Sequence, residues 1–161
     1  MDGSPAYRII GARWVKVTAW GHHNVKAAHR STFEVTTDEN LTPRGDCIVG
    51  VRSSTGAGGL PPWFREEARK PGAIIVAVLC SSGVCDSVAG RGDPGLEMSD
   101  PSRMIFRRST YIEPATVMVR AGKAARDLDR RLVESLRRGA RLDLYLTVIP
   151  PGDDYIPATE V

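Results

Sequence analysis

Residues 73–89 read AIIVAVLCSSGVCDSVA, an apolar run and a shorter second run on either side of a small polar loop. Short runs rich in β-branched residues, separated by a few residues that include glycine, are typical of a β-hairpin. The sequence therefore predicts a strand over residues 73–79, a loop over 81–84 and a second strand that ends near Ala89. In this hairpin Cys80 and Cys85 face each other across the two strands.

The predicted register leaves two states open for these cysteines. Opposed residues of an antiparallel pair lie about 4.5 to 5.5 Å apart, which overlaps the Cα separation of about 4.4 to 6.8 Å that a disulfide needs. Two free thiols fit equally well, because cysteine also packs as a small apolar residue. A zinc site is disfavoured, since no second cysteine or histidine pair accompanies them at ligand spacing.

Further strands follow from alternation of apolar and polar residues. Val15, Val17 and Ala19 alternate with polar neighbours, and so do the apolar residues from Val25 to Val35. We expect these two runs to pair around a three-residue loop, 22–24. The other elements that the sequence predicts are a short helix from Pro62 through Lys70 and strands over 48–51, around 104–106, over 116–119 and over 142–148.

One helix stands out in the second half of the chain. Ala125, Leu128, Leu132 and Leu136 recur at helical spacing, and Gly139 is a natural stop, so residues 123–138 are predicted to form one long amphipathic helix. The fold class that follows is α+β, a mostly antiparallel β-sandwich or barrel-like sheet with this helix. We expect a single domain over 1–161, with its core at about 7–149 and a tail at 150–161.

Composition narrows the class of protein. The 161 residues are 42% hydrophobic and 25% charged, with a formal charge of +3, as in an ordinary globular protein. The longest apolar run, 73–80, is too short to span a membrane, and residues 1–12 do not resemble a signal peptide, so a cytoplasmic protein is expected. Asparagine occurs at Asn24 and Asn40 only and glutamine is absent, which suggests a thermophilic source.

Three histidines, His22, His23 and His29, fall within eight residues. At the tip of the predicted hairpin, His22 is either a solvated turn residue or a catalytic acid or base. His29 would lie roughly 13 Å along the strand, too far to share a metal ion with His22, and is better explained as a core histidine. No metal site is predicted, and no motif identifies a cofactor.

Two other segments place polar groups at strand ends. Arg44, Asp46 and Cys47 stand before the strand at 48–51, where Asp46 could also simply stabilise a turn. Arg107, Arg108 and Ser109 follow another strand and suit a phosphate or carboxylate, although surface ion pairs explain them equally well. The leading hypothesis is a small-ligand or anion site that could also be an active site, with His22 and Asp46 as catalytic residues and ligand contacts from Arg44, Cys47, Arg107, Arg108 and Ser109.

Two rival functions use other features. The predicted helix carries six basic and three acidic residues, and this excess of positive charge, together with Trp14, Trp20 and Trp63, could bind nucleic acid. Its charges are also spaced as solvated i,i+4 pairs, the commoner reason for such a pattern. The third possibility is a structural subunit of a homo-oligomer that pairs through the apolar face of the first strand.

Two motifs resemble a known family. They are Gly21-His22-His23-Asn24-Val25, followed by His29, Thr32 and Glu34, and the segment Leu41 to Ile48, LTPRGDCI. Both closely resemble the opening of an uncharacterised archaeal family classed as a domain of unknown function. Residues 90–96, 105–109 and 123–128 are similar to it as well. The resemblance implies an archaeal source and a β-sandwich-like fold, and it implies no activity.

Overall fold

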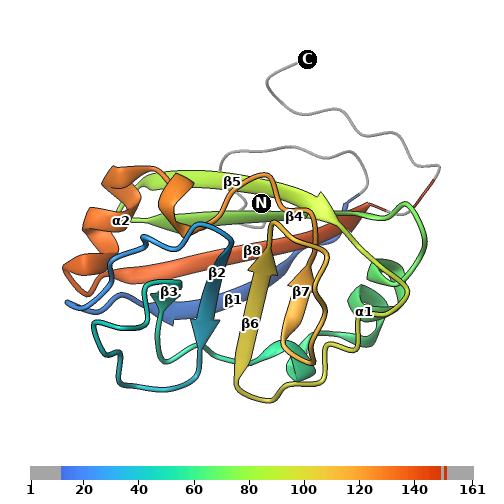
Figure 1. Cartoon of the computed structure of the whole chain (residues 1–161), viewed down its shortest axis with the longest axis horizontal. Helices are drawn as coiled ribbons and strands as arrows, with labels where there is room; N and C mark the ends of the chain where they lie inside the picture. Colours follow the sequence, from blue (N-terminus) through green and yellow to red (C-terminus); the bar gives the residue numbers. More distant parts are fainter. Residues whose placement is uncertain (1–11, 150, 152–161) are drawn as a thin grey trace.

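The computed structural model describes residues 12–149 and 151, in which eight strands form two four-stranded sheets (Figure 1). The first sheet has the strand order β1 (Val15–Trp20), β8 (Arg141–Ile149), β4 (Ile74–Ser81) and β5 (Val84–Arg91). The second has the order β3 (Ile48–Gly50), β2 (Thr32–Thr36), β6 (Arg103–Arg107) and β7 (Thr116–Met118). The helical elements are the 3-10 turns η1 (Ala57–Gly59) and η2 (Ala125–Asp127) and the helices α1 (Pro62–Ala68) and α2 (Arg130–Arg137).

The α+β class and the mostly antiparallel pairing are confirmed. Two pairs, β2 with β3 and β6 with β7, run parallel, and the remaining strand pairs are antiparallel. A closed barrel is not formed in the described ranges. The sheets are separate and are linked at their edges by single bridges, between Trp20 and Val51 and between Arg91 and Val119.

Each sheet turns an apolar face to one shared core. Val17 and Ala19 contribute from β1, and Phe33 and Val35 from β2, all fully or almost fully buried. Phe33 stacks on Phe106 of the neighbouring strand with ring centroids 4.4 Å apart. The alternation read in the sequence is therefore the alternation between core and outer face.

The β4–β5 hairpin has the predicted pairing. Cys80 and Cys85 are partners in the register, their Cα atoms lie 4.1 Å apart, and a disulfide joins them. The loop is shorter than predicted, because Ser81 pairs with Val84 and only Ser82 and Gly83 turn the chain. Both have positive φ, 50° and 80°, as a tight two-residue turn between twisted strands requires.

The predicted pairing of the first two strands is wrong. β1 pairs with β8, so that Val17 opposes Leu144, while β2 pairs with β6 and β3 in the other sheet. The alternation gives the buried face of a strand and not its partner, and residues between 21 and 31 carry the chain from one sheet to the other. Gly21 is needed at that crossing, because a Cβ there would collide with the backbone of Leu136.

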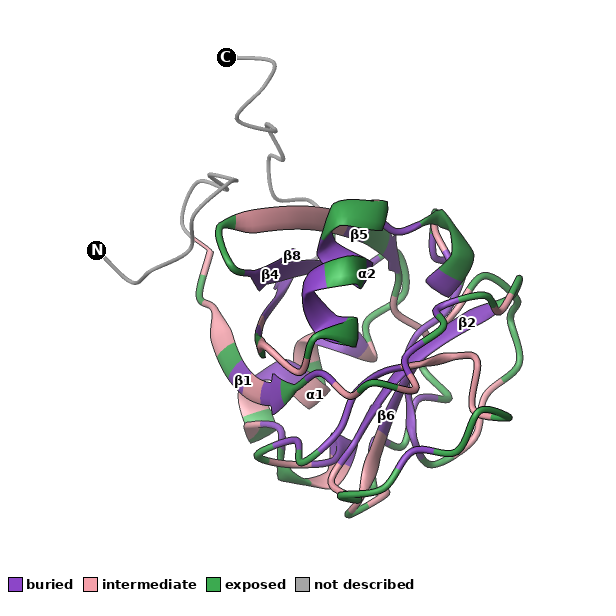
Figure 2. Cartoon of the chain, turned by 90° about the vertical axis from the view of Figure 1, so that its left-hand side faces the viewer, coloured by how far each residue is buried: buried purple, intermediate pink, exposed green. Residues whose placement is uncertain are grey.

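The prediction of one long helix over 123–138 is also wrong. Residues 125–127 form the turn η2, and α2 begins only at Arg130. Two aspartates cause the interruption: the Asp127 carboxylate accepts the amide of Ala124, and the Asp129 carboxylate caps α2 by accepting the amide of Arg131. The predicted apolar face survives across the break, since Leu128, Leu132 and Leu136 are buried. Figure 2 shows α2 with buried residues on one side and exposed residues on the other.

No helix in the described part of the chain is long and apolar enough to cross a membrane. The start of the predicted core at residue 7 and the predicted tail at 150–161 lie outside the described residues, Pro151 excepted.

Candidate functional site

Three segments that are distant in sequence meet at one end of the second sheet. The carbonyl oxygen of Asp46 accepts hydrogen bonds from the amides of Ala28 and His29, at 3.0 and 3.2 Å. The amide of Arg108, just after β6, donates to the carbonyl of Ser31 at 2.8 Å. The loops that carry the predicted site residues, near 22–31, 44–47 and 107–109, are thus joined through their backbones.

His29 is fixed in one tautomer at this junction. Its Nδ1 accepts hydrogen bonds from the amides of Ser31 and Thr32, both at 3.1 Å. A neutral imidazole that accepts at Nδ1 carries its proton on Nε2, and this assignment follows from the hydrogen-bond partners. His29 is only partly exposed, and it presents a donor, Nε2–H, rather than an acceptor. It is a turn-stabilising residue and not the core histidine that was expected.

Arginine residues adjoin His29 through backbone contacts and chain connectivity. The amide of Arg126 donates to the carbonyl of His29 at 3.1 Å, and the guanidinium groups of Arg108 and Arg126 lie 3.6 and 3.7 Å from the carboxylate of Asp127. Arg30, next in the chain, is exposed. We call these residues the His29 corner: His29, Arg30, Arg108, Arg126 and Asp127. With three arginines against one aspartate, the corner has an excess of two positive charges.

Arg107 and Ser109 are engaged elsewhere. The Arg107 side chain is 15% exposed, donates from Nε to the Thr116 hydroxyl at 3.2 Å and pairs with the Glu113 carboxylate at 3.4 Å. The Ser109 hydroxyl accepts the amide of Tyr111. Both belong to the packing of the outer sheet face and the loop after β6. Arg44 is exposed, and no ion pair is recorded for it in the described ranges.

Cys47 lies beside a buried carboxyl group that the sequence reasoning missed. Its thiol is 3.8 Å from Oε1 of Glu34, and Glu34 is 7% exposed on the outer face of β2. Burial raises the pKa of the Glu34 carboxyl, and burial together with the Glu34 charge raises the pKa of Cys47 to about 11. Cys47 is therefore a neutral thiol near pH 7, which disfavours a nucleophilic role. From the sequence, Glu34 can be recognised only as an outward-facing residue of an alternating strand. The loops that bury it cannot be recognised from that alternation.

His22 and Asp46 are not brought together by their side chains. The His22 Nδ1 accepts the amide of Asn24 at 3.0 Å, and its ring stacks on His23 with centroids 4.3 Å apart. Partial burial and the neighbouring His23 lower the pKa of His22. Asp46 contributes its backbone carbonyl, and within the described ranges no hydrogen bond joins it to His22. Nor do the described residues contain a group of His, Cys, Asp or Glu side chains able to hold a metal ion.

The basic residues of α2 are largely engaged within the fold. Arg130 donates to the carbonyls of Leu128, Ala125 and Ala27, and Arg137 donates to that of Val25. Arg131 pairs with Asp129 at 2.9 Å, a pair that the i,i+4 pattern did not predict. The helix therefore presents fewer unengaged cations than its sequence suggests.

Comparison with known proteins agrees with the family resemblance. The model of a family described as "Domain of unknown function (DUF371)" matches residues 17–149. The uncharacterized protein MJ0206 of Methanocaldococcus jannaschii is 36% identical over 132 residues, which cover 82% of this chain and 97% of that protein. The expected relationship to an uncharacterised archaeal family is confirmed.

Proposed function

The chain belongs to the DUF371 family, for which no function is assigned, and we propose that it binds a small anionic ligand at the His29 corner. The observation that carries the proposal is the set of hydrogen-bond donors there. His29 offers Nε2–H because its Nδ1 is occupied, and arginine has donors only. Such a set matches the oxygens of a phosphate or carboxylate.

The exposure of the two ion-paired arginines supports the same proposal. The side chains of Arg108 and Arg126 are 46% and 50% exposed, and both contact Asp127 at more than 3.5 Å. Exposed ion pairs of this kind contribute little to stability, so an incoming anion can compete with Asp127 at small cost. Arg107 is not a ligand contact in this proposal, because its side chain is engaged with Thr116 and Glu113.

Binding is favoured over catalysis. Cys47 is held as a neutral thiol. Among the described residues no carboxylate forms a hydrogen bond with His22, although acid-base catalysis needs such an orienting partner. His22, Asp46 and Arg44 remain part of the proposal as neighbours of the ligand, on the loops that the Asp46 carbonyl joins.

The test is a titration of the full chain with inorganic phosphate, followed residue by residue in amide NMR spectra. We expect saturable shifts at residues 29–31, 108 and 126. Arg108→Ala should weaken binding about tenfold, the loss expected for one charge-assisted contact of about 1.5 kcal/mol. Arg141→Ala is the matched control, because Arg141 is equally exposed and paired with Asp143 but lies in the other sheet.

Equal affinity of the parent and Arg108→Ala would overturn the proposal. So would the absence of saturable shifts at residues 29–31 at phosphate concentrations in the tens of millimolar.

A further inference from the structure

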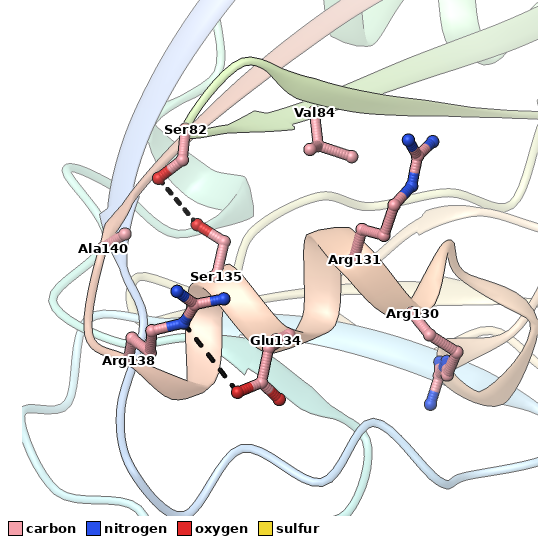
Figure 3. Close-up of a pocket in the computed structure, with 8 residues that line it drawn as sticks. All are labelled: Ser82, Val84, Arg130, Arg131, Glu134, Ser135, Arg138 and Ala140. Atoms are coloured by element: carbon pink, nitrogen blue, oxygen red, sulfur yellow. Dashed lines mark hydrogen bonds and ion pairs between the residues drawn. The ribbon is translucent and has the colours of Figure 1, made fainter.

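A groove lies between α2 and the β4–β5 turn, in a part of the molecule that the His29 corner does not include. Its volume is about 510 Å³, and it is open to solvent (Figure 3). This is within the size range of sites for small molecules. The residues that line it come from the turn, the helix and the segment after the helix: Ser82, Val84, Arg130, Arg131, Glu134, Ser135, Arg138 and Ala140.

Helical spacing brings two cations of the groove to the same face. Arg131, Ser135 and Arg138 are separated by four and three residues, so they follow one another along one side of the helix. Figure 3 shows Arg131 and Arg138 on the two sides of Ser135, with Arg130 turned away from them. Arg130 donates instead to the carbonyl of Ala27. Arg131 uses two donors on Asp129, and Arg138 stays 3.8 Å from Glu134, so both retain donors for a ligand.

A chain of hydroxyl groups ends in the groove. Ser135 Oγ donates to Ser82 Oγ at 2.8 Å, and Ser81 Oγ lies 2.7 Å from Ser135 Oγ. A hydroxyl has one proton, so Ser135, which donates to Ser82, must accept from Ser81. The proton of the exposed Ser82 hydroxyl then has no acceptor in this chain of three. Hydrogen bonds in such a series polarise one another, which makes Ser82 a better donor.

The backbone of Ser82 is strained. Its φ is 50°, a conformation that glycine and asparagine adopt more readily than serine. The two-residue turn requires this conformation, and a serine there costs stability unless the surroundings hold it. Here the surrounding support is the hydrogen bond from Ser135. The residue at this position, Ser82, is therefore the one whose hydroxyl faces the groove.

We propose that this groove is a second binding site, for a small molecule with an oxyanion head and a compact apolar body. Arg131, Arg138 and the Ser82 hydroxyl bind the head, a phosphate or a carboxylate. Val84 and Ala140 contact the apolar part. Glu134, which also lines the groove, favours a ligand with a single anionic head over one with several.

The experiment compares phenyl phosphate, benzoate and inorganic phosphate, each titrated into the full chain and followed in amide NMR spectra. We expect phenyl phosphate or benzoate to shift the amides of residues 82–84 and 134–138. The better ligand should bind about tenfold more tightly than inorganic phosphate, because the ring buries apolar surface against Val84 and Ala140. Whichever of the two binds more tightly identifies the head group.

Ser82→Gly is the decisive variant. Glycine tolerates the positive φ, so the turn folds while the hydroxyl is lost. We expect binding to weaken several-fold and the thermal midpoint to stay unchanged or to rise. Arg138→Gln should weaken binding about tenfold, and Arg91→Gln, at the exposed end of β5 away from the groove, should leave it unchanged.

Ring ligands that shift only residues 29–31 and 108 would overturn the groove site and leave the His29 corner standing. Undiminished affinity of Ser82→Gly would refute the role of the hydroxyl chain, and with it the proposed site. The two sites share no residue, so each can fail without the other.

Discussion

The guanidinium of Arg130 donates a hydrogen bond to the carbonyl oxygen of Ala27 at 3.1 Å and joins α2 to the loop that links the two sheets. Ala27 is fully buried and has a φ of 48°, an uncommon conformation for alanine. Arg137 binds the nearby carbonyl of Val25 in the same way. Two arginines of the helix therefore stabilise a strained loop by donating hydrogen bonds to its carbonyl oxygens.

This relationship predicts that Arg130 stabilises the fold. Arg130→Met removes donors to three carbonyls while retaining most of the aliphatic stem, and we expect a loss of about 1 to 3 kcal/mol in the free energy of unfolding, measured by urea denaturation. Arg131→Met is the control, because Arg131 is largely exposed and pairs only locally with Asp129, and it should change stability by less than about 0.5 kcal/mol. Equal losses in the two variants would contradict the structural role of Arg130.

Leu132 tests the apolar face of α2. The residue is fully buried in the shared core, and Leu132→Ala should cost about 2 to 5 kcal/mol, because the truncation leaves a cavity. Glu134→Ala, on the exposed side of the same helix, should cost less than about 0.5 kcal/mol. A loss under about 1 kcal/mol for Leu132→Ala would mean that the helix does not pack as described.

The disulfide predicts how many thiols can be titrated in the unfolded chain. With Cys80 and Cys85 bonded, the chain unfolded without reductant should titrate as one thiol, Cys47, and as three after reduction. Three thiols in the unreduced protein would refute the bridge.

The native reactivity of Cys47 is a separate prediction. Because burial raises its pKa to about 11, little thiolate is present at pH 8, and the native protein should react with a thiol reagent far more slowly than the unfolded protein. Comparable rates in the two states would show that Cys47 is accessible and ionised.

Glu34 predicts a dependence of stability on pH. Burial raises its pKa in the folded state, so the folded protein holds this proton more tightly than the unfolded chain does. The contribution of Glu34 to stability is thus greatest below the pKa of the unfolded chain, and it decreases as the pH rises through the folded pKa.

Glu34→Gln removes this titration, so the variant should gain stability relative to the parent as the pH rises above the ordinary glutamate pKa of about 4, as measured by denaturation at each pH. Glu97→Gln, at an exposed position, is the control. A stability difference between Glu34→Gln and the parent that stays constant with pH would refute the buried carboxyl.

Local pattern predicted the strands better than it predicted their partners. The hairpin around Ser82 and Gly83 was found because its two strands are adjacent in the chain and its turn residues are characteristic. The partner of β1 was not predicted correctly. The alternation at Val17 and Ala19 is compatible with pairing to β2 as well as to β8, and only the packing of the two sheets selects β8. The predicted helix is too long because the helical spacing of apolar residues continues through η2, although Asp129 is a recognisable cap residue.

The residues of the candidate site, like the strand pairings, were only partly predictable from the sequence. Polar residues at strand ends led to the expectation that three loops meet, and backbone hydrogen bonds do join them, while a ligand role for Arg108 stays a prediction. His29 and Arg126 were not assigned to the site, because their proximity depends on a hydrogen bond between residues from different halves of the chain. Glu34 was missed since burial of an outward strand residue depends on loops that cover it.

The strand order β1-β8-β4-β5 also constrains the biosynthesis of the chain. β1 precedes and β8 follows the other six strands of the described residues, yet Val15 pairs with Leu146 and Trp20 with Arg141. Until β8 emerges, β1 lacks its hydrogen-bonded neighbour, and β4 can pair only with β5. Closure of the first sheet therefore waits until β8 has been synthesised, and until then β1 presents an unpaired strand edge to other nascent chains.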